Sequence, residues 1–262
     1  MVILPYNKGL KILILSDLIK FSASFKDYER LAEQYILSLS EPVAKRITNI
    51  ERSMRIFIEF VYGYLPAAGE IKWPVLKPNY DTSASEAQLI PFNEAYSYNI
   101  TDKIVHFYIA DYLFMRIFRN PEKYISFLKS CRGVIGPDMS QYTDMPAEMR
   151  YWHAWCNAYM SSLLQQAGVN LYYNVTWSKA DSYPYSCPSN LAGSAIAINS
   201  NAVHCNDLAL YRWRCGYSYV VKTLHPSHII RYGQPVEGEL TDISSYHVNE
   251  RLKLLRDGSK RK

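Results

Sequence analysis

Polar or aromatic side chains follow each of the five strands that the sequence of this 262-residue chain predicts. Three of these side chains are carboxylates, at Asp111, Asp138 and Asp144. Carboxylates that different strands bring together can bind Mg²⁺ or act as a general acid and base. We therefore predict these three aspartates as candidate catalytic residues. The other candidates at the strand ends, all predicted to bind a ligand, are Ser140, Tyr142, Trp177, Ser178, Asn199 and Tyr232.

Structural alternatives exist for these residues. Asp144 lies just before a predicted helix, where an N-cap is expected, and Asp111 or Asp138 could likewise cap a helix or close a turn. Trp177 could stack on a base or a sugar, or it could belong to the core at the end of its strand. Asn199 could orient a ligand or satisfy a turn.

Other catalytic and metal-binding patterns are weak. His153 and Cys156 are one helical turn apart, but the spacing of Cys and His along the chain is not that of a zinc finger or ribbon. The chain contains no Walker A loop, GxGxxG, GxSxG or HExxH motif. This excludes the common nucleotide hydrolases, Rossmann-type dinucleotide enzymes, α/β-hydrolases and zincins. The sequence thus argues against zinc, allows Mg²⁺ and leaves open whether the chain is an enzyme.

The elements that must position the candidate residues alternate along the chain. Short and almost wholly apolar segments predict strands over residues 103–111, 133–138, 171–178, 194–199 and 228–233. Apolar residues at intervals of three or four predict helices over residues 112–129, 146–167 and 207–224.

This alternation predicts an α/β fold with a mostly parallel sheet, because such strands are joined by right-handed crossovers. Strands that are apolar on both sides fit a sheet covered on both faces. An open doubly wound sheet and an irregular βα-barrel both remain open. Five strands are too few for a closed eight-stranded barrel unless residues 11–17 and part of 66–100 contribute. In either fold, ligands bind beyond the carboxyl ends of the strands.

Four segments are predicted along the chain. Residues 1–65 form a mostly helical region, and residues 66–102 form an irregular connector rich in Pro and Ser. Residues 103–235 form the α/β core domain. Residues 236–262 form a C-terminal extension, with one helical stretch over 246–255 and a basic end.

The net charge of +5 comes from the end of the chain. The last twelve residues carry six Lys or Arg and one acid, whereas residues 1–250 carry 23 basic and 23 acidic residues. A domain that binds duplex DNA through its surface usually has a basic face. Nucleic acid is therefore suggested only weakly, by the tail 251–262.

Targeting signals are not evident in the sequence. Its apolar runs fall short of the roughly 18–20 residues of a membrane span, and the N-terminus lacks a secretory layout. The five cysteines are odd in number and form no CxxC pair. We predict a cytoplasmic protein with no membrane partner.

Several stretches carry a resemblance to a known family. They are HFYIADY (His106 to Tyr112), NPEKY (Asn120 to Tyr124), GVIGPDMSQYTDMP (Gly133 to Pro146), NVTWS (Asn174 to Ser178), Ser182-Tyr183 with Cys187, and LHPS (Leu224 to Ser227) followed by His228 to Ile230 and Tyr232-Gly233. Through them, residues 103–235 resemble a domain family of unknown function that is common in bacteriophages, plasmids and integrative elements. The resemblance covers about half of the chain and leaves out its first hundred residues and its tail.

The resemblance implies a mobile-element origin and a single α/β domain, with the host cytoplasm as the location if the chain is phage-encoded. It implies no reaction, because the family has none assigned. Relatives tend to carry basic residues in the helix after Pro146, where this chain has WHAWCN (residues 152–157). A phosphate-binding role for this helix is therefore in doubt here.

Three functions are compatible with these features. The first is a phage or mobile-element accessory protein that binds a nucleotide, sugar-phosphate or nucleic-acid end at the strand ends. The second is a non-catalytic interaction factor, such as an inhibitor of a host defence complex, with its interface built from some of the 23 tyrosines. The third is a DNA-replication accessory that is anchored by the basic tail. A host protein or a second copy of the chain is the expected partner.

Overall fold

The computed structural model describes residues 73–201 and 203–247. Contacts divide the chain into two units, Met1–Trp73 and Pro74–Lys262, and the fold below is that of the second. The helices predicted within residues 1–65, the possible strand at 11–17 and the basic tail lie outside the described residues.

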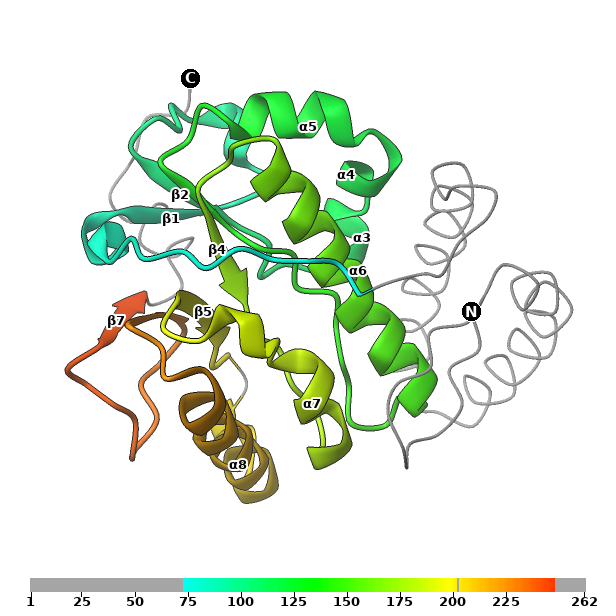
Figure 1. Ribbon diagram of the computed structural model, residues 1–262, viewed down its shortest axis with the longest axis vertical. Coiled ribbons are helices and arrows are strands. Elements are labelled where there is room, and N and C mark those ends of the chain that lie inside the picture. Colours follow the sequence, from blue (N-terminus) through cyan, green and yellow to red (C-terminus); the bar gives the residue numbers. More distant parts are fainter. Residues whose placement is uncertain (1–72, 202, 248–262) are drawn as a thin grey trace, which may run out of the picture. The chain divides into compact units, whose positions relative to one another are not determined.

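Seven parallel strands form one sheet in which the spatial order equals the chain order (Figure 1). They are β1 (Gln88–Pro91), β2 (Lys103–His106), β3 (Gly133–Ile135), β4 (Leu171–Asn174), β5 (Ala195–Asn199), β6 (His228–Tyr232) and β7 (Ser244–His247). Every neighbouring pair is parallel. An all-parallel sheet with a single direction of winding curls toward a barrel, so the α/β prediction is confirmed and the irregular βα-barrel is the alternative that holds.

The sheet is nearly closed, and side chains fill its interior. The rings of His106 on β2 and Tyr232 on β6 lie 4.6 Å apart between centroids, although three strands separate β2 from β6 in the sheet. Deeper inside, small Ala195 and Ala197 on β5 share a core cluster with the larger Tyr172 of β4. Small and large side chains together fill the barrel, so its interior is a packed core and not a pore.

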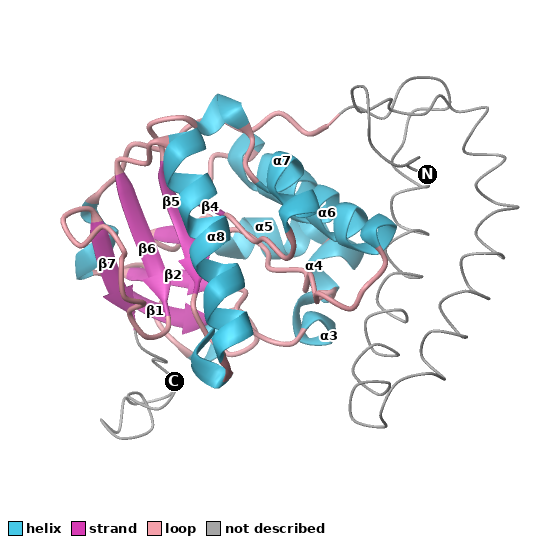
Figure 2. Cartoon of the chain, turned by 90° about the horizontal axis from the view of Figure 1, so that it is seen from below, coloured by secondary structure: helices cyan, strands magenta, loops and turns pink. Residues whose placement is uncertain are grey.

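Helices connect most of the strands on the outside of the barrel (Figure 2). The α-helices are α3 (Asp111–Phe114), α4 (Arg116–Arg119), α5 (Pro121–Leu128), α6 (Ala147–Gln166), α7 (Tyr183–Ser186) and α8 (Asp207–Leu224). The 3₁₀ turns are η1 (Ser83–Glu86), η2 (Ala95–Ser97), η3 (Ala180–Ser182), η4 (Ser189–Leu191) and η5 (Val203–Cys205).

The ends of the long helices follow known capping chemistry. Asn206 caps α8, because its side chain accepts a hydrogen bond from the backbone N–H of Ala209 at 2.9 Å. His225 ends α8 in the left-handed conformation, with φ of 42°. After α6, Gly168 takes φ of 85°, as is typical of a glycine that follows a helix C-terminus.

Two strands lie outside the segment predicted to form the core. β1 falls within residues 66–102, which were predicted to be irregular, and β7 includes Tyr246 and His247, which were predicted to be helical. β1 was missed because it has only four residues and ends in Pro91, a residue type that argues against a strand. It takes its place at the edge of the sheet, beside β2 alone.

The chain that precedes β1 closes the amino end of the barrel. The carbonyl of Asn79 accepts a hydrogen bond from the N–H of Ala195, at the start of β5, at 2.6 Å. Asp81 accepts hydrogen bonds from the Tyr172 hydroxyl at 2.6 Å, from Asn170 Nδ2 at 3.0 Å, and from the N–H and hydroxyl of Ser83 at 2.8 and 2.6 Å. Asp81 thus ties η1 to β4 at this end.

Candidate functional site

Asp111 meets the loop after β3 at the carboxyl end of the barrel. It is the first residue of α3, in the connection that follows β2. Its side chain does not cap that helix. Its carboxylate instead accepts hydrogen bonds from Ser140, at 3.0 Å from the hydroxyl and 3.3 Å from the backbone N–H. Two predicted site residues from different connections are therefore in direct contact.

Asp138 joins the ends of three strands. It follows β3, and its Oδ1 accepts hydrogen bonds from Asn174 Nδ2 on β4 at 2.8 Å and from the Thr176 hydroxyl at 2.6 Å. Its Oδ2 lies 3.5 Å from Nδ2 of Asn199, the last residue of β5. Asp138 and Asn199, both predicted from sequence, are thus brought together, while Asn174 and Thr176 were missed. These two occupy alternate positions of one chain segment and so point to the same side.

Burial gives the two carboxyl groups unusual proton affinities. Asp111 is 4% exposed, and burial raises its pKa to about 7, although the two Ser140 hydrogen bonds pull in the opposite direction. The negative charge of Asp138 raises the pKa of Asp111 further. Burial also raises the pKa of Asp138, but the hydrogen bonds from Thr176, Asn174 and Asn199 oppose this effect. Near neutral pH, Asp111 therefore both releases and takes up its proton.

A layer of rings lies in the barrel below these carboxylates. Tyr108 donates a hydrogen bond to Asn174 Oδ1 at 3.0 Å, and its ring stacks on that of Tyr232 at 4.9 Å. His106 contacts the same Tyr232 ring, and burial together with the nearby His247 lowers the pKa of His106 to about 3. Among Tyr108, Tyr232 and His106, the sequence predicted only Tyr232 as a site residue. The available signal was the period of two along the segment from Ile104 through His106 to Tyr108, which assigns these residues to one face.

Three other predicted residues lie in the loops after β3 and β4. Asp144 is exposed and is not the cap of α6, since Pro146 occupies that position. Tyr142 is half-buried in the same loop. Ser178 is buried, and its backbone N–H donates to the Ser182 hydroxyl at 2.9 Å.

Trp177 packs against α8. A Cβ atom placed on Gly216 would lie 2.0 Å from Trp177 Nε1, so this position of α8 accepts only glycine beneath the indole. The Trp177 ring also lies 5.7 Å from that of Trp213. Of the two alternatives for Trp177, these contacts favour a role in packing at the strand end.

Comparison with known proteins identifies the chain's relatives. Residues 65–248 match a family described as a domain of unknown function (DUF4417). The chain belongs to this family. The match confirms the predicted resemblance and extends it toward the N-terminus, into residues that were predicted to lie outside it.

Two phage proteins are similar to this DUF4417 chain. The Gene 1 protein of Mycobacterium phage L5 is 25% identical over 134 residues, which is 50% of this chain and 57% of the relative. The Gene 1 protein of Mycobacterium phage D29 is 22% identical over 174 residues, which is 64% of this chain and 63% of the relative. The chain therefore spans about three fifths of each relative. No solved structure matches it.

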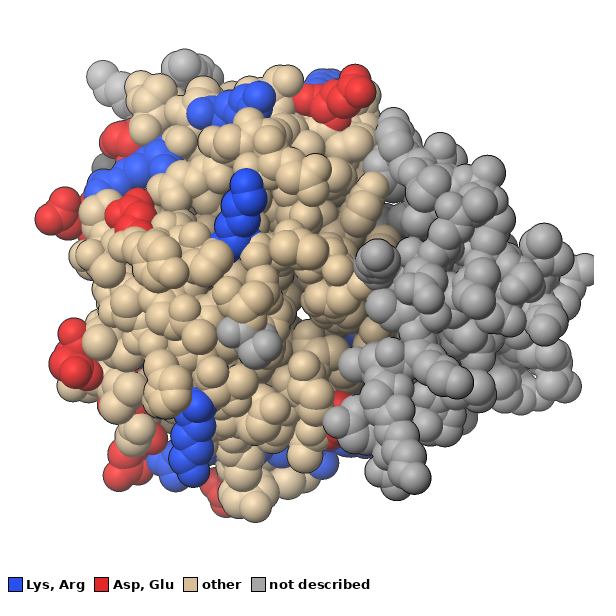
Figure 3. Space-filling view, viewed as in Figure 1, with Lys and Arg blue, Asp and Glu red and all other residues tan. Residues whose placement is uncertain are grey.

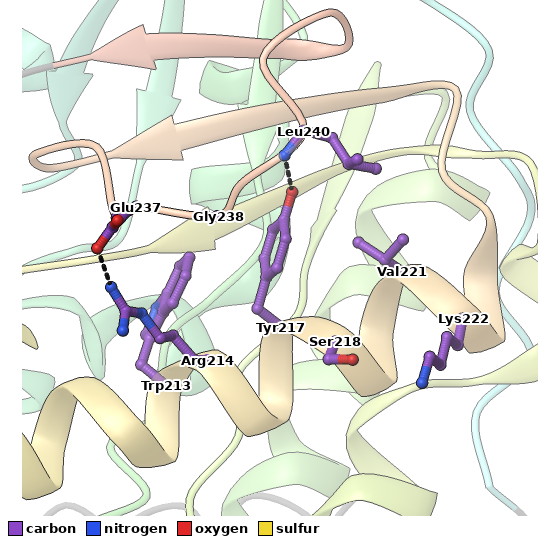
Figure 4. Close-up of a pocket in the computed structure, with 9 residues that line it drawn as sticks. All are labelled: Trp213, Arg214, Tyr217, Ser218, Val221, Lys222, Glu237, Gly238 and Leu240. Atoms are coloured by element: carbon purple, nitrogen blue, oxygen red, sulfur yellow. Dashed lines mark hydrogen bonds and ion pairs between the residues drawn. The ribbon is translucent and has the colours of Figure 1, made fainter.

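A groove on the outside of this DUF4417 domain adjoins the site. It has a volume of about 280 Å³ and lies between α8 and the connection from β6 to β7 (Figure 4). The Tyr217 hydroxyl accepts a hydrogen bond from the N–H of Leu240 across it, and Arg214 pairs with Glu237 at its rim. From the groove wall, Trp213 Nε1 donates to the carbonyl of Asn199 at 3.1 Å. α8 thus braces the end of β5 at the site.

Within residues 73–201 and 203–247, no three His, Cys, Asp or Glu side chains gather as metal ligands do. On the face of the molecule in Figure 3, acidic and basic residues are scattered and mixed. None of the helices in the described part is long and apolar enough to cross a membrane.

Proposed function

We propose that this domain is a phage or mobile-element accessory protein that binds a hydroxyl- or amine-bearing ligand at the carboxyl end of its barrel. The sugar or base of a nucleotide, sugar-phosphate or nucleic-acid end has this chemistry. The observation that supports the proposal is the pair of neighbouring carboxyl groups, Asp111 and Asp138, held at the ends of adjacent parallel strands, where ligands of such folds bind.

The partners of the two carboxyl groups favour this class of ligand. The side chains that hydrogen-bond to them are all neutral: Ser140, Asn174, Thr176 and Asn199. The site therefore keeps the negative charge of its carboxylates, which attracts hydroxyl and amine donors and repels a phosphate. A phosphate of the ligand would accordingly point out of the barrel.

The two carboxyl groups also suit acid–base chemistry. A group with a pKa near 7 both gives and takes a proton at neutral pH, and a neighbouring carboxylate kept ionised completes a pair with distinct roles. We assign the proton-exchanging role to Asp111 and the charge-bearing role to Asp138. Each is held by side chains from other segments, so the pair is rigid before a ligand binds.

The test is a binding screen with matched aspartate variants. Nucleosides, nucleotides and sugar phosphates are added to the full chain, and binding is measured by ligand-observed NMR and calorimetry. We expect Asp138→Asn to weaken binding at least tenfold, while Asp207→Asn, a change at an exposed aspartate at the start of α8, leaves it unchanged. Equal binding by wild type and both variants, or no binding by any compound, contradicts the proposal.

A protein partner at the same end is the second candidate function. Three of the large apolar side chains that are more than half exposed lie on two helices of the barrel: Tyr112 (56%) on α3, and Leu208 (54%) and Tyr211 (66%) on α8. Each helix starts in the connection that follows a strand, β2 for α3 and β5 for α8, so these side chains lie toward the carboxyl end of the barrel. Aromatic residues in such positions are typical of interfaces.

Host lysate passed over the immobilised chain tests this second function. We expect a host protein to be captured by the wild type and by Asp138→Asn, and to be lost when Tyr112 and Tyr211 are both changed to Ser. Capture that depends on Asp138 and not on the tyrosines contradicts it.

A further inference from the structure

A line of polar side chains runs along the buried side of α6. His153, Asn157 and Ser161 are spaced four residues apart, so they lie above one another on one face of the helix. They are 0%, 2% and 0% exposed. Buried polar groups usually make hydrogen bonds. His153 and Asn157 make theirs with another segment of backbone, whereas the Ser161 hydroxyl has no partner among the described residues.

The segment that they hold is the loop carrying Asp138. His153 Nδ1 makes a short hydrogen bond with the carbonyl of Ser140. Asn157 Oδ1 accepts a hydrogen bond from the N–H of Met139 at 2.8 Å. At the start of the loop, a Cβ on Gly136 would lie 2.6 Å from Ser161 Oγ, so the backbone passes close to the helix there.

We propose that His153 and Asn157 position the site, and that His153 holds Ser140 where it donates its two hydrogen bonds to Asp111. This inference rests on the proposed function, since Asp111 and Asp138 are its site. Ser140 presents its carbonyl to His153 and its N–H and hydroxyl to Asp111. A shift of this residue would weaken both hydrogen bonds to Asp111 at once. His153 is thus a positioning residue that acts through Ser140.

The protonation of His153 is fixed by its surroundings. Burial lowers the pKa of His153 to about 4, and the hydrogen bond to Ser140 opposes this only in part, so the ring is neutral at pH 7. A carbonyl oxygen can only accept a hydrogen bond, so Nδ1 of the neutral ring must be the donor and carry the hydrogen. Nε2 therefore carries none. Nε2 is buried and has no hydrogen-bond partner among the described residues. Asp111 in turn faces Ser140 and the charge of Asp138.

The decisive measurement is the titration of Asp111, followed by ¹³C NMR of its carboxyl carbon and assigned with Asp111→Asn. His153→Leu keeps the bulk of the ring and removes the donor, whereas His153→Asn keeps an N–H donor at the same position along the side chain. We expect His153→Leu to raise the pKa of Asp111 by about one pH unit, because the carboxylate loses donors, and His153→Asn to restore the wild-type value. A wild-type titration in folded His153→Leu overturns the inference.

A second measurement needs no variant. ¹⁵N NMR of the imidazole nitrogens of the wild-type chain reports which one is protonated. Hydrogen on Nδ1 and a bare Nε2 are expected, and hydrogen on Nε2 overturns the inference even if His153→Leu fails to fold. Neither measurement uses a ligand. An unsuccessful ligand screen therefore counts against the proposed function and leaves the positioning role of His153 standing.

Discussion

Aspartates at the two ends of the same barrel are held in opposite states. At the amino end, burial works to raise the pKa of Asp81, but hydrogen bonds from Ser83, Tyr172 and Asn170 outweigh it and bring the pKa below its usual value. At the carboxyl end, Asp111 receives hydrogen bonds from Ser140 alone and faces Asp138, and its pKa rises to about 7. The number of donors and the neighbouring charge therefore decide which aspartate stays ionised.

The contrast separates a structural aspartate from the one that we propose to bind a ligand. Asp81 accepts hydrogen bonds from several donors, so its charge stabilises the folded chain. Asp111 is 4% exposed and has fewer donors, so ionising it works against folding. In the proposed function, a ligand with hydroxyl or amine groups would donate the hydrogen bonds that the protein does not supply to Asp111. The amino end of the barrel would then serve stability and the carboxyl end binding, as in parallel βα-barrels generally.

The largest expected effect is on the pH dependence of stability. The pKa of Asp111 is about 7 in the folded chain against 3.8 in the unfolded one, so the folded state binds more protons between these values and stability falls as pH rises from 4 to 7. At about 1.4 kcal/mol per pH unit, the loss approaches about 4 kcal/mol. Asp111→Asn removes this loss, so we expect the variant to be more stable than wild type at pH 8 and equally stable at pH 4.

Urea unfolding at both pH values measures this difference. Asp144→Asn is the matched control, because it removes an exposed carboxyl group from the same end, and it is expected to keep the wild-type pH dependence. Parallel pH profiles for wild type and Asp111→Asn would show that Asp111 is ionised in the folded chain, and the contrast with Asp81 would be lost.

Removing the structural aspartate comes next in size. Asp81→Ala deprives the Tyr172 hydroxyl of its acceptor, and the Tyr172 side chain is buried. We expect the free energy of unfolding at pH 7 to fall by about 3 kcal/mol. Because the pKa of Asp81 is depressed in the folded chain, its contribution is present above pH 4 and is lost as pH falls further, so the variant and wild type converge in acid.

Asp102→Ala is the control for Asp81→Ala. Asp102 is exposed and pairs with Lys103 at 2.7 Å, a contact worth less than about 1 kcal/mol. Similar losses from the two substitutions would mean that the hydrogen bonds at the amino end give no special stability.

The sequence predicts the helices and strands that have a clear pattern of apolar residues, and it misses the short strands that lack one. The five predicted strands and the long helices α6 and α8 come from runs of apolar residues that are visible locally. β1 and β7 have four residues each and become strands because β2 and β6 offer them edges to pair with. Local sequence contains no record of such partners.

The same limit applies to the site. Asp111, Asp138, Ser140 and Asn199 were predicted because the carboxyl ends of parallel strands converge. His153 was considered only as part of a weak zinc pattern, yet it bonds to Ser140, because the pitch of α6 and the course of the β3 loop bring the two together. His106 and Asn174 were missed because polar residues inside an apolar strand reveal a function only when the barrel interior is known.

A smaller effect is expected within the carboxyl end, where Trp177 meets α8. Gly216→Ala pushes a methyl group into the Trp177 indole and should lower the free energy of unfolding by about 2 kcal/mol. In a Trp177→Ala background the clash is gone, and the same change should stabilise α8 by up to about 1 kcal/mol, since alanine is the better helix former. A double-mutant cycle by urea unfolding measures this change of sign. A cost that is the same in both backgrounds would show that Trp177 does not pack on Gly216.

The smallest expected effect compares two serines that make the same contact at opposite ends. The Ser83 hydroxyl donates to Asp81 at 2.6 Å, and the Ser140 hydroxyl donates to Asp111 at 3.0 Å. At pH 5, Asp81 is ionised and Asp111 is protonated, so Ser83→Ala removes a charge-assisted hydrogen bond and Ser140→Ala a neutral one. We expect losses of about 1 kcal/mol and less than about 0.5 kcal/mol respectively in unfolding measured at pH 5. At pH 8 the loss of stability caused by Ser140→Ala should grow to match that of Ser83→Ala, because Asp111 is then ionised as well. If the loss caused by Ser140→Ala is the same at pH 5 and pH 8, Asp111 does not change its charge between these pH values.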